Sequence, residues 1–119
     1  MHTLNEERQF GFERLEVWRF AMIALREIKS LQFPKFGDLK QQLERAALSI
    51  AANLAEGVGK DGADQRRFFG IARGSTYECG ALIESAYALE LIGADARMRV
   101  RAPLLSVAAM LTRLTRQPA

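Results

Sequence analysis

The chain has 119 residues, the length of one ordinary domain, and can bury a core without disulfides or a structural metal. Its composition, 49% hydrophobic and 26% charged with only three prolines, is typical of a soluble helical protein and excludes a disordered or fibrous chain. The net charge of +3 permits contact with phosphate groups but is far below that of a dedicated basic tail.

The numbers of cysteines and histidines and the hydropathy of the chain exclude further classes of protein. The single cysteine, Cys79, excludes an intramolecular disulfide framework, and the single histidine, His2, lies at the terminus, so no Cys/His metal site is expected within one chain. The N-terminus has no apolar signal region, and no apolar run approaches the roughly 18 residues of a membrane span. We therefore expect one cytoplasmic domain over residues 1–119, without a membrane partner, cofactor or small-molecule substrate.

Residues 1–12 are mostly polar, and we interpret them as an arm that becomes ordered at Phe10 and Phe12. A first helix is predicted over about residues 13–31, because its apolar residues recur at helical spacing around more than half of the circumference. Pro34 follows this stretch, and a proline restrains the residue before it and lacks an amide donor. The helix therefore ends before it.

A second helix is predicted over about residues 39–56, with Asp38 as its N-cap. Its core stripe consists of Leu39, Leu43, Ala46, Ala47, Ile50 and Leu54. A polar ridge with spacings of three and four runs beside it: Gln42, Arg45, Ser49, Asn53 and Glu56. This ridge is either a solvated face or a partly buried hydrogen-bond network that fixes which helices pair.

The segment 57–62 contains three glycines and Lys60, which raises the question of a phosphate-binding loop. A Walker loop lies between a strand and a helix and has Ser or Thr after its lysine, and neither condition holds here. We reject that interpretation. Gly57 instead suits a left-handed C-terminal cap, and Asp61 suits the N-cap of the next helix.

A third and longest helix is predicted over about residues 63–92. Its expected core face consists of Phe68, Ile71, Ala72, Ser75, Cys79, Leu82, Ile83, Ala86 and Leu89. On this face Cys79 is interpreted as a small buried thiol and not as a nucleophile. Ser75 has no histidine to activate it, so a hydrolase site is not expected.

Small residues gather on the opposite side of this third helix. A glycine inside a helix costs about 1 kcal/mol relative to alanine, so two glycines facing water would be a poor use of these positions. Close approach of another helix explains them, and since the core occupies the other face, that helix would come from another subunit. Together with two outward residues of the second helix, they form the predicted oligomer face: Leu48, Ala52, Gly70, Gly74, Ala81 and Ala88.

A fourth helix is predicted over about residues 96–115, after a short turn capped by Asp95. Its expected core residues are Val100, Leu104, Val107, Ala108, Leu111 and Leu114. Pro103 lies inside this pattern and either kinks the helix or marks its true start. Four helices with short connections and no strand pattern predict an all-α fold, an antiparallel up-and-down four-helix bundle.

Three stretches of this sequence resemble a known family: Leu15-x-Val17-Trp18, Gln42-x-x-Arg45-Ala46-Ala47-x-Ser49-Ile50-x-x-Asn53-Leu54-Ala55-Glu56-Gly57, and Arg67-Phe68 with Ala72-Arg73-Gly74-Ser75-x-x-Glu78. Over roughly residues 12–92 the chain resembles the four-helix-bundle proteins encoded in intervening sequences of bacterial 23S ribosomal RNA genes. The resemblance implies a non-enzymatic cytosolic bundle that assembles into a five-membered ring. It also implies a structural role for the signature positions Asn53, Glu56, Gly57, Arg73, Gly74, Ser75 and Glu78.

The accessory protein of diversity-generating retroelements is similar in fold to that family. It binds a reverse transcriptase and nucleic acid through a basic surface, so the resemblance implies, as an alternative, an accessory subunit of a reverse-transcriptase system. The net charge of +3 is small for that role.

Three functional hypotheses follow. The first is an oligomeric scaffold, expected to be a homopentamer whose partner is itself. The second is binding of RNA or DNA, since five copies of +3 would carry about +15. Its candidate residues, for each of which ordinary solubility is the alternative explanation, are Lys60, Arg66, Arg67, Arg97, Arg99, Arg101, Arg113 and Arg116.

The third hypothesis is an enzyme. It requires Arg73, Glu56 and Glu78 to converge as an acid–base cluster, whereas Arg–Glu networks are more often structural. We therefore expect no catalytic, cofactor-binding or metal site.

Overall fold

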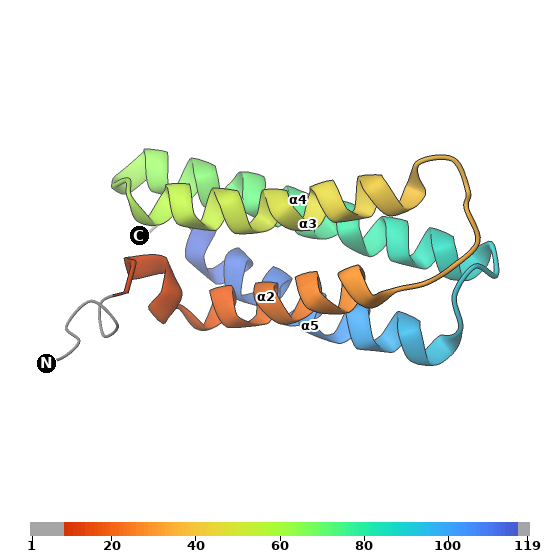
Figure 1. Cartoon of the computed structure of the whole chain (residues 1–119). Helices are drawn as coiled ribbons and strands as arrows, with labels where there is room; N and C mark the ends of the chain where they lie inside the picture. The colour runs from red at the N-terminus through yellow and green to blue at the C-terminus, as the bar shows by residue number, and fades with distance from the viewer. Residues whose placement is uncertain (1–8, 117–119) are drawn as a thin grey trace, which may run out of the picture.

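The computed structural model describes residues 9–116, and within them the chain forms a short 3-10 turn followed by four α-helices, with no strand (Figure 1). The elements are η1 (Gly11–Arg14), α2 (Glu16–Ser30), α3 (Leu39–Val58), α4 (Gly62–Ala88) and α5 (Ala94–Thr115). The helices run side by side in alternating directions, which confirms the predicted four-helix bundle. No helix in this range is long and apolar enough to cross a membrane.

Each helix packs on two neighbours, which gives the bundle a square cross-section. Helix α3 lies beside α2 and α4, helix α5 lies beside α4 and α2, and no Cα atoms of the diagonal pairs approach within 8 Å in the described range. The side formed by α2 and α3 therefore lies opposite the side formed by α4 and α5. The η1 turn, the α3–α4 turn and the end of α5 all lie at one end of the bundle (Figure 1).

The core is a single layer of aliphatic side chains contributed by one stripe of each helix. In α3 the whole predicted stripe is buried, and Gly57 is buried with it. Fully burying one large aliphatic side chain stabilises the folded state by about 1.5–3 kcal/mol, so this layer supplies most of the driving force for folding. The largest fully buried aliphatic side chains are Ile28, Leu43, Ile50, Leu54, Ile83, Val100, Val107 and Leu111.

The predicted core face of the third helix was partly wrong. Ile71 and Leu89 are 42% and 47% exposed, while Phe69 and Thr76 are buried in their place. Leu89 lies beyond the end of α4, which stops at Ala88 because Glu90 takes a positive φ of 61°. Because α4 packs between α3 and α5, its buried arc is wide: the ring of Phe69 packs against Gly57 of α3, and Thr76 lies on the flank toward α5.

Several boundaries differ from the prediction for local reasons. Helix α2 begins only at Glu16, because Leu15 is extended and separates it from η1. Helix α3 continues through Gly57 to Val58, so the expectation of a left-handed cap at Gly57 was wrong; among glycines in the described range, only Gly37 and Gly62 have positive φ. Pro103 is buried inside α5, so it does not mark the start of that helix.

Candidate functional site

A small hydrogen-bond network joins α3 to α4 at the middle of the bundle. The hydroxyl oxygens of Ser49 and Ser75 lie 2.8 Å apart. The Nδ2 of Asn53 donates to the carbonyl oxygen of Ser49 at 2.9 Å and to its Oγ at 3.2 Å. Ser75 is 9% exposed, so this polar contact is largely shielded from water. Two signature residues, Asn53 and Ser75, thus meet through Ser49.

The polar ridge predicted along the second helix divides into two parts. Ser49 and Asn53 belong to the interhelical network. Arg45 and Glu56 instead face water, with side chains 66% and 54% exposed, and each makes a 3.8 Å ion pair, Arg45 with Asp38 and Glu56 with Lys60. The network interpretation therefore holds for the centre of the ridge and the solvated-face interpretation for its ends.

We expect the buried centre and the exposed ends of this polar ridge to contribute differently to the free energy of unfolding. Ser49→Ala or Asn53→Ala should lower the free energy of unfolding by about 1 kcal/mol, because a shielded hydroxyl or amide loses its partner. Glu56→Ala should change it by less than about 0.5 kcal/mol, because exposed ion pairs contribute little. Urea unfolding of the three variants measures the difference. Equal losses in all three would contradict the division.

Gly57 is fixed by the close approach of α3 and α4. A Cβ at this position would lie 2.7 Å from Cε1 and 2.8 Å from Cδ1 of Phe69, and 3.3 Å from Cβ of Phe68. Phe69 is only 4% exposed, so its ring has little room to move aside. The signature glycine thus permits contact between two helices and does not form a loop.

Arg73 connects α4 to α5 through its hydrogen bonds. Its Nε donates to Oγ1 of Thr112 at 2.8 Å, its Nη2 donates to the hydroxyl of Tyr77 at 3.3 Å, and the guanidinium lies 4.9 Å from the centre of the Tyr77 ring. Glu78 is exposed, and no hydrogen bond or ion pair within residues 9–116 joins any two of Arg73, Glu56 and Glu78. The acid–base cluster required by the enzyme hypothesis is not formed.

The remaining predicted residues of α4 have simple environments. Gly74 is exposed and has open space around it. Cys79 is fully buried, and desolvation, with a smaller effect of the nearby Glu78 carboxylate, raises the pKa of its thiol to about 12. The thiol therefore stays protonated and unreactive near neutral pH.

A second polar cluster, which the sequence reading missed, lies between α4 and α5. Nε of Arg97 donates to both carboxylate oxygens of Glu84 at 2.9 Å, and Nη1 of Arg101 donates to Oε2 at 2.8 Å. Hydrogen bonds from Arg97, opposed by partial desolvation and reinforced by Arg101, lower the pKa of Glu84. The only sequence signal is that Arg97 and Arg101 are one turn apart.

This cluster predicts a pH dependence of stability. Because the pKa of Glu84 is lowered in the folded protein, its contribution is fully present above the ordinary pKa of a glutamate and is lost as the pH falls through the lowered value. The difference in free energy of unfolding between wild type and Glu84→Gln should therefore shrink on acidification. Denaturant unfolding from about pH 7 to about pH 3 measures it. A difference that stayed constant over this range would contradict the assignment.

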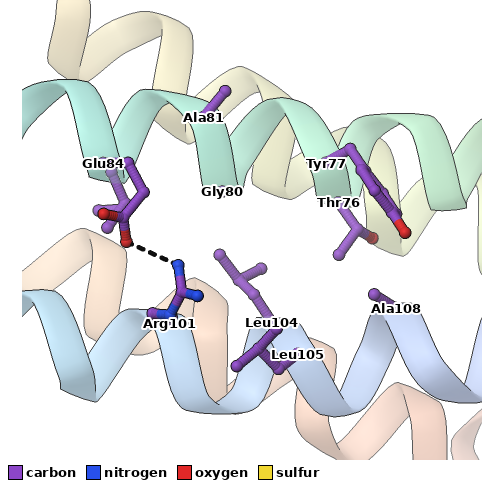
Figure 2. Close-up of a pocket in the computed structure, with 10 residues that line it drawn as sticks. Thr76, Tyr77, Gly80, Ala81, Glu84, Arg101, Leu104, Leu105 and Ala108 are labelled. Atoms are coloured by element: carbon purple, nitrogen blue, oxygen red, sulfur yellow. Dashed lines mark hydrogen bonds and ion pairs between the residues drawn. The ribbon is translucent and has the colours of Figure 1, made fainter.

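An apolar groove lies beside the cluster, between α4 and α5. Figure 2 shows Tyr77 toward one end of it and the Glu84–Arg101 ion pair at the other, with Leu104, Leu105 and Ala108 along the α5 wall. Its volume is about 280 Å³. The groove exists because small residues, Gly80 and Ala81 on α4 and Ala108 on α5, leave space between the two helices.

The predicted nucleic-acid-binding residues do not form one free basic surface. Five of the eight are in ion pairs: Arg97 and Arg101 with Glu84, Arg99 with Glu27, Arg67 with Asp64, and Lys60 with Glu56. Arg66, Arg113 and Arg116 make no ion pair within the part of the chain that the structure describes. Arg66 lies near the start of α4 and the other two at the end of α5, so these three share one end of the bundle (Figure 1).

All six residues of the predicted oligomer face are exposed. A Cβ added at Gly70 or Gly74 would meet no atom within 4 Å, and Leu48 is 56% exposed. The six do not form one patch. Leu48 lines a groove between α2 and α3, whereas Ala81 lines the α4/α5 groove on the opposite side.

Comparison with known proteins identifies the family of this chain. No curated protein matches this chain. The family model described as 23S rRNA-intervening sequence protein matches residues 13–113. This match extends beyond the three motif stretches and includes nearly all of α5. The chain therefore belongs to the 23S rRNA-intervening sequence protein family.

Proposed function

We propose that this protein is a non-enzymatic, cytoplasmic, homo-oligomeric helical scaffold, with five copies arranged in a ring. The observation that carries the proposal is the exposure of Gly70 and Gly74 inside the long helix α4, where a Cβ would meet nothing. Each glycine lowers helix stability by about 1 kcal/mol relative to alanine, and the isolated bundle offers no contact that requires it. Close approach of a second copy would explain why glycine, and not alanine, occupies these two positions.

Exposed apolar side chains support the same proposal. Leu48, Tyr77 and Leu105 are 56%, 57% and 55% exposed, and they lie on different helices around the outside of the bundle. Exposed apolar area beyond scattered single residues marks interaction surfaces. Two distinct apolar surfaces on one bundle are what a cyclic assembly needs, because each copy presents one surface to each neighbour.

Sedimentation velocity over a concentration series tests the proposal. We expect one species heavier than the 13.3 kDa chain at micromolar concentration. A protein that sediments as a monomer throughout the series would overturn it.

Binding of RNA is a second candidate, and it is favoured by the free arginines at one end of the bundle. Arg66, Arg113 and Arg116 would be repeated in every copy of a ring and would present a basic rim to phosphate groups. Such binding should weaken steeply with salt.

A titration of labelled RNA tests this candidate. Arg113→Gln with Arg116→Gln should abolish binding at low salt, and Arg99→Gln, whose arginine already pairs with Glu27 at 3.4 Å, is the matched control. Binding that is absent in wild type, or that does not depend on salt, would count against it.

Two other roles have less support. A reverse-transcriptase accessory role depends on an extended basic surface, and five of the eight predicted basic residues are paired with carboxylates. An enzymatic role would need another site, because Arg73 hydrogen-bonds toward α5 while Glu56 and Glu78 are exposed.

A further inference from the structure

We propose that the groove between α4 and α5 is a docking site for an acidic amphipathic helix of another protein. The groove is apolar along its centre and positively charged at both ends, so the matching occupant has apolar side chains with carboxylates before and after them. Such a partner is additional to the proposed oligomer. Gly70 and Gly74, on which that oligomer depends, do not line the groove.

The centre of the groove offers mainly apolar contact. Small residues of both helices leave it open, and leucines of α5 form one wall (Figure 2). Tyr77 and Leu105 are 57% and 55% exposed at its margins. The hydroxyl of Thr76, which also lines the groove, donates to the carbonyl oxygen of Ala72 at 2.8 Å within its own helix. Apolar side chains of a partner would therefore replace water here at no loss of hydrogen bonds.

The size and shape of the groove favour side chains that project from a chain over a separate small molecule. Pockets that take a small molecule are about 300–1,000 Å³ and bury most of its surface. This groove has a volume of about 280 Å³ and lies open along two antiparallel helices (Figure 2). A third helix laid along such a groove inserts side chains from successive turns, which is a common mode of peptide recognition.

Arg73 supplies a positive charge at the Tyr77 end of the groove. Its guanidinium lies 4.9 Å from the centre of the Tyr77 ring. Its hydrogen bonds go to two neutral hydroxyls, and it makes no ion pair within residues 9–116. Because a guanidinium has five N–H donors, Arg73 keeps donors for an incoming carboxylate.

The opposite end of the groove is also positively charged. Arg97 and Arg101 both pair with Glu84, and two positive charges against one negative charge leave +1. Hydrogen bonds from Arg97 first, and from Arg101, lower the pKa of Glu84, so its carboxylate is ionised near neutral pH. With Arg73 the total is +2. Glu78, the next carboxylate on α4, is exposed and does not line the groove.

The distance between the two charged ends sets the spacing expected in the partner. Arg73 and Glu84 lie 11 residues apart on α4. At 1.5 Å per residue this separation is about 16 Å. A partner helix with carboxylates about 11 positions apart, and apolar side chains between them, would meet both ends at once.

The α2/α3 side of a second copy does not have this chemistry. The groove on that side is lined by Leu25 and Leu48, but also by Arg26 and Lys29, with Glu44 as a carboxylate. Placed on the α4/α5 groove, it would set like charges against each other, and like charges brought together oppose association. Charge therefore favours a different protein with an acidic face.

Fluorescence anisotropy with two labelled synthetic helices tests the docking site. The acidic probe is an alanine-based peptide of about 20 residues, with leucines one turn apart at its centre and glutamates on both sides of them. The second probe has lysine in place of every glutamate. We expect wild type to bind the acidic probe about tenfold or more tighter than the lysine probe, and the difference to shrink as salt is added.

Two variants with matched controls locate the bound probe. Gly80→Leu fills the groove without a clash, since a Cβ there meets no atom within 4 Å, and should weaken binding of the acidic probe about tenfold or more. Ala102→Leu, at an exposed position outside the groove, should not. Arg73→Gln should weaken binding about threefold, whereas Arg99→Gln, whose arginine pairs with Glu27, should leave it unchanged. Circular dichroism checks that each variant is folded.

Several results would overturn the docking site. Equal binding of the two probes would mean that charge does not select the occupant, and undiminished binding to folded Gly80→Leu would place the probe elsewhere. Absence of binding of the acidic probe up to about 1 mM would exclude it outright. Labelled RNA or phosphatidylserine vesicles that bind wild type but not Gly80→Leu, while the acidic probe does not bind, would assign the groove to phosphate groups instead. The oligomeric state is measured separately by sedimentation, so the two proposals can fail independently.

Discussion

Replacing Gly57 by alanine is expected to lower the free energy of unfolding by about 2 kcal/mol, although alanine is the better helix former. The new methyl group would lie 2.7 Å from the buried ring of Phe69, closer than carbon atoms normally approach. Overpacking of this kind typically costs about 1–3 kcal/mol, and the gain in helix propensity near a helix end offsets only part of it.

Gly59→Ala provides the matched control. A Cβ there would lie 3.6 Å from the carbonyl oxygen of Glu56, an ordinary contact, and its φ of −79° suits any residue. Urea unfolding of both variants should show a clear loss for Gly57→Ala and a change of less than about 0.5 kcal/mol for Gly59→Ala. A Gly57→Ala protein as stable as wild type would mean that α3 and α4 do not pack this closely.

Replacing Gly74 by glutamine should have opposite effects on folding and on association. Within one copy the position is open, so the change should raise the stability of the bundle by up to about 1 kcal/mol through helix propensity. At a surface that another helix approaches closely, the same side chain must be displaced or buried. We expect association to weaken at least tenfold, which corresponds to about 1.4 kcal/mol or more.

The two effects are measured on one preparation of the variant at two concentrations. Thermal unfolding at nanomolar concentration, followed by fluorescence of Trp18, reports the stability of the separate copies, and light scattering at micromolar concentration reports their association. Ala109→Gln, at an exposed position on α5, is the control and should leave association unchanged. If Gly74→Gln associates as strongly as wild type, the part of the predicted oligomer face around Gly74 is not an interface.

The fold was predictable where the apolar residues lie on a single arc of a helix. In α3 the apolar stripe lies on a single arc, and all six predicted core positions are buried. Prediction was weaker in α4, whose apolar residues are spread around more of the helix, so that its buried arc includes residues outside the expected stripe. As a result, Ile71, which was expected in the core, is exposed, and Thr76, which was not expected there, is buried.

The contacts between helices were less predictable than the helices themselves. Gly57 was interpreted from its own neighbours as a cap, but its role is set by the ring of Phe69 across the α3–α4 turn. Likewise, whether an arginine is free or paired depends on the register of the packed helices. Arg99 pairs with Glu27 and Arg97 with Glu84, and neither carboxylate is near its arginine in the sequence.

Native mass spectrometry of the wild-type protein distinguishes a bundle that assembles through its outer surfaces from one that stays a monomer. A ring of five copies has a mass of about 66.5 kDa, five times the 13.3 kDa of one chain, and this is the expected result. A spectrum at micromolar concentration that contains only the 13.3 kDa monomer would contradict this assembly.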